Sequence, residues 1–214
     1  MIIDPNDFEG FNRVLTGIVV PRPIALVSSV SREGIVNLAP FSFFNAVSYQ
    51  PAMLVVSIAR SAGWKDKDTL SNIEATGEFV VNVVVEDIAE AMNSTAAEFP
   101  SDVNEFEVAN LTPVAAEYVT PPLVYESPAN FECRLKQVVD IGDGDHQYGL
   151  VIGSIIAVHI RDELIQGHRI NHELLKPVGR LAGNLYCKTD DTYQLVRPTY
   201  DAPSEDDWDC NTWK

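Results

Sequence analysis

The stretch that decides the fold is "RPIALVSSVSREGIVNLAPFSFFN", residues 22–45. Two segments rich in β-branched residues, 24–30 and 35–39, flank the four-residue loop "SREG", which ends in glycine. Strand-like runs on both sides of such a loop are typical of a β-hairpin. We therefore predict a hairpin, followed by the segment "NLAPFSFFN" (residues 37–45), whose crowded aromatic and polar side chains suit a plain strand poorly.

Most of the remaining chain also favours strands. Residues 52–59 and 78–85 are apolar, β-branched runs of the length expected for buried strands. Residues 128–141 and 148–160 are two longer runs joined across "GDGD", which predicts a second hairpin. The chain therefore belongs to the mainly β class, and a closed or split antiparallel barrel would bury so many strands without exposed edges.

Two short helices interrupt these strands. In "KDTLSNIEATGE" (residues 67–78), Asp68 or Thr69 is expected to cap a helix that Gly77 ends. Residues 86–99, acidic at the start, predict a second helix. Residues 99–122 contain prolines and little periodicity, so we expect a surface excursion. Residues 1–197 are predicted to form one domain and the acidic residues 198–214 a tail.

Composition excludes several functional classes. The chain has 214 residues, 46% of them hydrophobic, and a formal net charge of −16, which argues against a nucleic-acid partner. No apolar run is long enough to span a membrane, and the acidic start "MIIDPNDFEGFNR" lacks the basic region of a secretory signal. Three widely spaced cysteines argue against a disulfide framework or a zinc site. We expect a cytoplasmic protein.

Charge is distributed unevenly. Residues 68–133 contain no lysine or arginine, whereas Arg60, Lys65 and Lys67 lie close together just before them. One interpretation is a solvated loop with scattered charges. The other is an anion pocket, because a phosphate favours cations together with the N–H groups of a helix N-terminus.

Several motifs in order resemble the flavin reductase-like family of FMN-binding split barrels. They are residues 22–48, "KDTLSNIEATGEFVVNVV", "ESPANFECRL", "LVIGSIIAVHI" and "VGRLAGNLY". The family includes flavoredoxin and the reductase partners of two-component monooxygenases, and the similarity extends from about residue 11 to residue 197. The resemblance implies a split antiparallel Greek-key β-barrel with a few short inserted helices, a homodimer, and FMN bound near the dimer interface.

The resemblance also implies a site. Ser42 and Asn45 would hydrogen-bond the flavin ring or its ribityl chain, between walls formed by Phe41, Phe43 and Phe44; alternatively, the three phenylalanines are core and Pro40 marks a sheet edge. Pro40 lacks a ladder donor, so we expect the strand to break there. The expected cofactor-binding residues are Ser28, Ser29, Asn37, Ala39, Pro40, Ser42, Phe43, Asn45, Arg60, Lys67, Thr69 and Asn72.

Other motifs carry weaker signals. His146, in "GDH", resembles a histidine that lies beside the nicotinamide in short flavin reductases, although a surface hairpin histidine explains it equally well. Arg180 and Gly183 match a family motif in which Ala182 replaces a glycine. His168 and His172 lack a third ligand, so no metal site is predicted.

The expected activity is hydride transfer from NADH or NADPH to flavin N5, as in a flavin reductase. The alternative is a flavoredoxin-like FMN protein that a partner protein reduces. A monooxygenase or another electron acceptor would receive the electrons.

Overall fold

In the computed structural model, residues 1–61, 67–142 and 146–198 are described. Within them, seven strands form one antiparallel sheet in the order β2-β1-β5-β8-β9-β4-β3. The strands are β1 (Ala25–Val30), β2 (Val36–Phe41), β3 (Phe44–Tyr49), β4 (Ala52–Ser61), β5 (Glu78–Val83), β8 (Ala129–Ile141) and β9 (His146–Ile160). Both predicted hairpins, β1–β2 and β8–β9, are confirmed.

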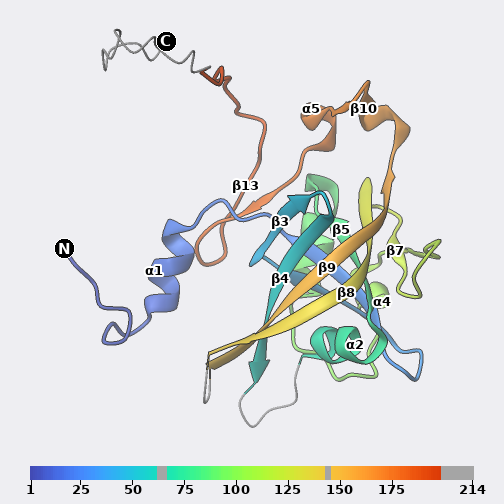
Figure 1. The fold of residues 1–214 in the computed structure, drawn as a ribbon, viewed down its shortest axis with the longest axis horizontal. Coiled ribbons are helices and arrows are strands. Elements are labelled where there is room, and N and C mark those ends of the chain that lie inside the picture. The colour runs from blue at the N-terminus through green and yellow to red at the C-terminus, as the bar shows by residue number, and fades with distance from the viewer. Residues whose placement is uncertain (62–66, 143–145, 199–214) are drawn as a thin grey trace, which may run out of the picture.

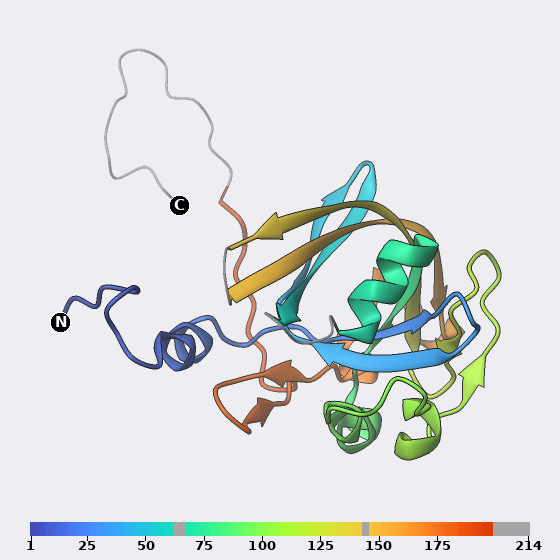
Figure 2. The same cartoon turned by 90° about the horizontal axis from the view of Figure 1, so that it is seen from below.

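The sheet curls so that its two edge strands are consecutive in the chain (Figures 1 and 2). Only Ser42 and Phe43 separate β2 from β3, and within the described residues these two strands share no ladder. The backbone N–H of Ser57 in β4 donates to the carbonyl oxygen of Phe43 at 2.8 Å. The barrel is therefore open between β2 and β3, which confirms the predicted split antiparallel barrel.

The interior of the barrel is apolar and is closed at one end by α2 (Asp68–Thr76), as Figures 1 and 2 show. Leu70 and Ile73 of this helix pack with Phe79 of β5 in a single buried cluster. Gly153 of β9 lies against the Phe79 ring, because a Cβ at Gly153 would stand 2.4 Å from Phe79 Cζ. The predicted inward face of the helix is confirmed.

A second apolar cluster covers the outer face of the β1–β2 hairpin. Leu26 and Leu38 of the hairpin pack there with Met92 of α3 (Ala89–Ser94) and Phe106 of α4 (Glu105–Ala109). Because side chains from both faces of this hairpin pack in apolar clusters, β2 and the N-terminus of α2 are held in place. These two elements form the site described below.

Three local predictions were wrong. The strand does not break at Pro40, because β2 continues to Phe41 on the edge of the sheet. Neither Asp68 nor Thr69 caps α2; Lys67 is its N-cap residue and makes no side-chain cap hydrogen bond. The expected surface excursion, residues 99–122, contains α4 and buries Phe106.

The predicted end of α2 is confirmed. Gly77 has a φ of 75°, in the left-handed region that glycine adopts without a steric penalty. The second predicted helix is shorter than expected, with a 3₁₀ turn η1 (Glu86–Ile88) followed by α3.

The remaining elements are short. They are α1 (Phe11–Ile18), β6 (Pro113–Val114), β7 (Leu123–Val124), η2 (Asp162–Leu164), β10 (Ile165–Gln166), β11 (Arg169–Ile170), α5 (His172–Leu175), β12 (Gly179–Arg180) and β13 (Tyr186–Cys187). Helix α1 projects from the barrel beside the β12–β13 hairpin (Figure 1) and has no buried residue. Among the described helices, none combines the length and the apolarity needed to cross a membrane.

Candidate functional site

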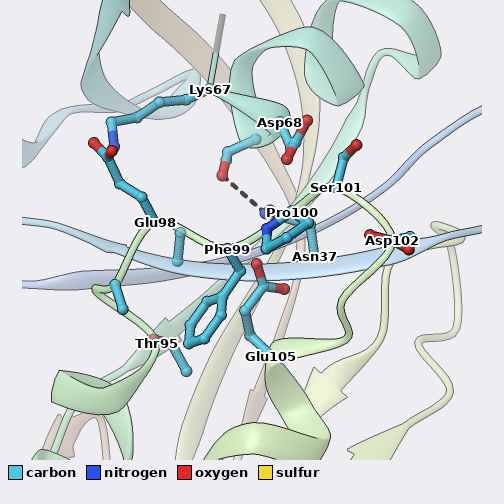
Figure 3. A pocket seen from close by; sticks show the side chains of 13 residues that line it. Asn37, Lys67, Asp68, Thr95, Glu98, Phe99, Pro100, Ser101, Asp102 and Glu105 are labelled. Atoms are coloured by element: carbon cyan, nitrogen blue, oxygen red, sulfur yellow. Dashed lines mark hydrogen bonds between the residues drawn. The ribbon is translucent and has the colours of Figure 1, made fainter. Parts of the chain in front are cut away.

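A hollow of about 450 Å³ lies between the edge strand β2 and the start of α2 (Figure 3). This volume lies within the range of small-molecule and cofactor sites. The hollow combines residues that are distant in the sequence, from β2, the N-terminus of α2 and the segment that precedes α4. The lining residues are Asn37, Ala39, Lys67, Asp68, Thr69, Thr95, Ala97, Glu98, Phe99, Pro100, Ser101, Asp102 and Glu105.

A buried hydrogen-bond network forms the floor of this first hollow. Asn37 Nδ2 donates to Thr69 Oγ1 at 2.9 Å and to Ser29 Oγ at 3.3 Å, and Figure 3 draws the first of these bonds. Asn72 Nδ2 donates to the same Ser29 hydroxyl at 3.1 Å. All four side chains are buried. The network fastens the first turn of α2 to β1 and β2, so the N-terminus of this helix faces the hollow.

Among the described residues, acidic side chains predominate in the lining of the first hollow. The anion pocket that the sequence suggested also includes Lys65, which lies outside the described residues. The described lining contains Asp68, Glu98, Asp102 and Glu105, and one cation, Lys67. Glu98 and Asp102 are exposed at the rim, and Figure 3 shows the Lys67 side chain extending toward Glu98.

Glu105 is the buried member of this acidic set, only 7% exposed. Burial raises the pKa of its carboxyl, and the charge of Asp68 adds to the rise. The backbone N–H of Leu38 donates to Glu105 Oε2 at 3.0 Å and acts in the opposite direction. A raised pKa extends the pH range over which the carboxyl is protonated and uncharged.

A second hollow, of about 420 Å³, adjoins the first along β2. In two places, neighbouring residues of the chain line different hollows. Ala39 lines the first hollow and Pro40 the second, and Thr95 lines the first and Ala96 the second. The second hollow is lined by Asn12, Arg13, Thr16, Arg22, Ile24, Pro40, Phe41, Ser42, Met92, Ala96, Arg180, Leu181, Gly183 and Tyr186. It therefore lies at the opening of the barrel between β2 and β3.

Arg22 is the buried centre of this second hollow. Its Nη1 donates to the carbonyl oxygens of Thr16 and Val19 at 2.7 and 2.8 Å, and its Nε donates to Ser42 Oγ at 3.3 Å. Burial lowers the pKa of the Arg22 guanidinium, and the neighbouring charge of Arg180 lowers it further. The arginine joins the end of α1 to the turn between β2 and β3.

The sequence that forms this split barrel and its two hollows matches a known protein family. The family profile described as "Flavin reductase like domain" matches residues 17–173. The chain belongs to this flavin reductase-like family. The match spans the whole sheet, from the β1–β2 hairpin to the end of β9, and covers the first hollow and the β2 side of the second.

Individual proteins of this family are similar over most of the chain. A protein of Aquifex aeolicus is 38% identical over 188 residues, which are 87% of this chain and 94% of that protein. The crystal structure of nitrilotriacetate monooxygenase component B from Bacillus cereus has a TM-score of 0.87 and 38% identity, and covers 91% of this chain and 98% of that chain. The 2-nitrobenzoate 2-nitroreductase of Pseudomonas fluorescens gives 0.83 and 34%, covering 96% and 100%. These similarities support an oxidoreductase role.

Most of the residues expected to bind the cofactor lie around the two hollows of this flavin reductase-like domain. Asn37, Ala39, Lys67 and Thr69 line the first hollow, over Ser29 and Asn72 in its floor. Pro40 and Ser42 line the second. The exposed Phe43 lies beside the second hollow, with its ring centroid 6.0 Å from Cζ of Arg22. Asn45 is exposed on β3, outside both linings.

Two expected contacts lie elsewhere. Successive side chains of a strand point to opposite faces, and Ser28 faces away from the first hollow, where its hydroxyl donates to the carbonyl oxygen of Pro122. Arg60 is not among the lining residues either. Its guanidinium is bound by Glu74 and Asp140, whose carboxylates raise its pKa. Both side chains therefore have structural partners in this conformation.

The remaining sequence signals have mixed outcomes. Phe41 and Phe44 pack against the interior core, as the core alternative predicts, but Phe41 also lines the second hollow and Phe43 is exposed. His146 begins β9, but its side chain lies outside the described part of the chain, as do Lys65 and residues 199–214. Among the described residues, no group of three side chains could hold a metal ion.

Sequence reasoning missed two residues that shape the site. Arg22 and Glu105 both line a hollow. Arg22 lies in the motif of residues 22–48 but was not singled out, and Glu105 lies outside the motifs. The one signal for Arg22 is its position at the start of the first strand motif, immediately before Pro23. Glu105 lies in an acidic stretch that offers no such signal.

Proposed function

We propose that this protein is an FMN-dependent oxidoreductase that accepts hydride from NADH or NADPH. The observation that carries the proposal is the pair of adjoining hollows along β2, one at the N-terminus of α2 and one at the opening of the barrel. An elongated ligand with a phosphate at one end and a flat ring at the other fits this arrangement.

The phosphate end belongs at the first turn of α2. This turn has no side-chain cap, and helix N-termini favour anions through their N–H groups and the helix dipole. Lys67 stands beside it and is the one cation among the described residues that line the first hollow. A single phosphate site of this kind, without a dinucleotide fingerprint in the sequence, supports FMN over FAD.

The ring end belongs beside Pro40, Ser42 and Phe43. Pro40 offers an apolar surface without an N–H group, and Phe43 is 39% exposed, so both can cover a face of a planar ring. The Ser42 hydroxyl is held by Arg22 Nε at 3.3 Å and can hydrogen-bond the ring edge. Bound flavin supplies an acceptor for the hydride of reduced nicotinamide. The protein orients the two rings and excludes water from them.

We propose further that the protein acts as a homodimer. The edge strand β3 presents apolar side chains to solvent, with Val47 55% and Tyr49 88% exposed. Together with Phe43 they expose apolar surface along this edge, interrupted by Asn45, and we call these three side chains the strip. Soluble proteins seldom leave a large apolar surface uncovered. A second copy would cover both the strip and the ring.

The reduced flavin would serve a separate electron acceptor. The similarity to nitrilotriacetate monooxygenase component B supports an oxygenase as that acceptor. Such a partner would receive reduced flavin from this protein and carry out the oxygen chemistry itself.

The test begins with the purified protein. Flavin released by heat is compared with FMN and FAD standards by chromatography, and the holoprotein is then titrated with NADH and with NADPH under argon. We expect FMN and loss of its visible absorbance with at least one donor. Recovery of FAD as the main species would contradict the choice of cofactor. Bound FMN that neither donor reduces would favour the flavoredoxin-like alternative.

A further inference from the structure

The second hollow has a charge that the rest of the chain does not share. The protein carries 31 acidic and 15 basic residues, yet the described residues that line this hollow include Arg13, Arg22 and Arg180 and no acidic residue. The described lining of the first hollow, which adjoins it, contains four acidic residues and one lysine. The two compartments of the site therefore favour groups of opposite charge.

Two of these arginines are fixed directly opposite one another. The backbone N–H of Arg22 donates to the backbone carbonyl oxygen of Arg180 at 2.9 Å. The backbone N–H of Arg180 donates to the backbone carbonyl oxygen of Arg22 at 2.8 Å. Like charges directly opposite each other in an antiparallel pair are destabilising. Neither arginine forms an ion pair with a carboxylate among the described residues. The described part of the fold therefore holds two cations together without a carboxylate counter-ion.

Donors remain for a ligand. Arg180 uses Nη1 for the Tyr186 hydroxyl and Nη2 for the carbonyl oxygen of Gly183, while its Cζ lies 4.5 Å from the centroid of the Tyr186 ring. A guanidinium has five N–H donors, so three of those of Arg180 have no partner in the described residues. The side chain of Arg13, on α1, makes no hydrogen bond within the described residues. The guanidinium of Arg22, in contrast, donates to backbone carbonyl oxygens and to the Ser42 hydroxyl.

We propose that Arg13 and Arg180 bind the anionic group of the molecule that exchanges hydride with the flavin. The inference rests on the proposed function, because Pro40 and Ser42 place the flavin ring at this same hollow. The shared chemistry is an anion joined to a planar ring. It has two sources: the diphosphate of a nicotinamide dinucleotide, which gives the hydride, and the carboxylate of an aromatic acid that carries a reducible group, which accepts it. Guanidinium groups bind both anions by paired N–H donors.

Isothermal titration calorimetry tests the anion site by binding alone, with no measurement of enzyme activity. Pyrophosphate and benzoate are titrated separately into the FMN-loaded protein in a buffer free of phosphate. Arg180→Gln should weaken binding of the preferred anion about ten- to a hundredfold, and the more exposed Arg13→Gln about two- to tenfold. Arg169→Gln is the matched control, because it removes the same charge from an exposed position on β11, and it should leave the affinity unchanged.

The two anions separate the two sources. Tighter binding of pyrophosphate assigns the hollow to the dinucleotide donor, and tighter binding of benzoate assigns it to an aromatic acid. The absence of binding by either anion would overturn the proposal, as would an equal loss in Arg169→Gln. Arg13→Gln keeps the test valid if Arg180→Gln fails to fold, because the Arg13 side chain has no hydrogen-bond partner among the described residues.

The FMN affinity of the same variants separates this inference from the proposed function. It should change less than about twofold. If Arg180→Gln lost FMN and anion binding to the same extent, the arginines would hold the cofactor's own phosphate and the inference would be wrong. A wild-type protein that binds no flavin would contradict the proposed function instead, while pyrophosphate and benzoate could still be titrated into it.

Discussion

The backbone N–H of Leu38 donates a hydrogen bond to Oε2 of Glu105 at 3.0 Å. Leu38 lies on the edge strand β2, so this N–H points away from the sheet, where a further strand would otherwise pair. Because N–H groups alternate in direction along a strand, the nitrogen of Pro40 also faces outward. Pro40 therefore removes no hydrogen bond from the sheet. On the same edge, the Glu105 carboxylate accepts the outward-facing N–H of Leu38, so this N–H is also satisfied without a further strand.

Replacement of Glu105 tests the charge of the first hollow. The pKa of this carboxyl is raised by burial, so the folded protein binds its proton more tightly than the unfolded chain does. Its contribution to stability is present below the unfolded pKa and is lost as pH rises through the folded pKa. Urea unfolding from about pH 4 to about pH 8 should show this loss in the wild type and not in Glu105→Gln.

The amide oxygen of Glu105→Gln can still accept the Leu38 N–H. Glu107→Gln, on the exposed side of α4, is the control and should keep the wild-type pH profile. The same loss of stability in Glu105→Gln would show that another group titrates.

Lys67→Ala tests the phosphate end of the proposed site. Loss of a charge-assisted contact should lower the FMN affinity about ten- to a hundredfold. Riboflavin, which lacks the phosphate, should bind the variant and the wild type equally. Fluorescence titration with both ligands measures this, and because Lys67 is exposed the melting temperature should not change. Equal losses for the two ligands would place the phosphate elsewhere.

Thr69→Val tests the floor of the first hollow rather than a ligand contact. Thr69 is 1% exposed, and its hydroxyl accepts from Asn37 at 2.9 Å. Valine keeps the shape but leaves the Asn37 amide with one acceptor fewer, which should cost about 1–3 kcal/mol of unfolding free energy. Thermal or urea unfolding measures the loss. Asn37→Ala in the Thr69→Val background should add less than it does alone, whereas additive losses would show that the two side chains act independently.

Gly153→Ala should destabilise the barrel interior. The added methyl group would stand 2.4 Å from Cζ of Phe79, a ring that is fully buried. Overpacking of this kind typically costs about 1–3 kcal/mol. Urea unfolding measures the change, and Phe79→Leu in the same chain should recover part of it by making room. An unchanged midpoint in Gly153→Ala would mean that the Phe79 ring moves freely.

The proposed homodimer is tested on β3. Light scattering should report about twice 23.6 kDa for the wild type. Val47→Asp places a charge in the exposed strip of β3 and should shift the protein toward the monomer, whereas Val108→Asp, exposed on α4, should not. A wild-type monomer that binds FMN tightly would defeat the proposal that a second copy completes the site.

Local patterns explain why the hairpins and the end of α2 could be predicted. The loop before Val36 turns the chain and Gly77 ends α2, each through the conformational preferences of its own residues. Such local preferences can be read from a short stretch of sequence. The residues in the floor of the first hollow could also be predicted. Ser29, Asn37, Thr69 and Asn72 lie in two sequence motifs, and the family resemblance assigns both motifs to the same site.

Contacts between distant segments explain what could not be predicted. Arg22 meets Arg180, and Leu38 meets Glu105, only after the chain has folded. No spacing or periodicity in the sequence links either pair. The acidic character of the first hollow has the same origin, since Asp102 and Glu105 reach it from a segment that its prolines made look like a loop.

The two-residue connection at Ser42 and Phe43 has a consequence for how the protein can change. At this point β2 and β3 are joined only by the polypeptide chain and not by a hydrogen-bond ladder. No strand pairing therefore has to open to admit a planar molecule. A ligand could therefore enter and leave while amide protons of β1, β5 and β8 stay protected from exchange with solvent. Substitutions near this connection can retune which molecule is accepted without altering the strand pairing, so a single scaffold can serve different electron-transfer partners.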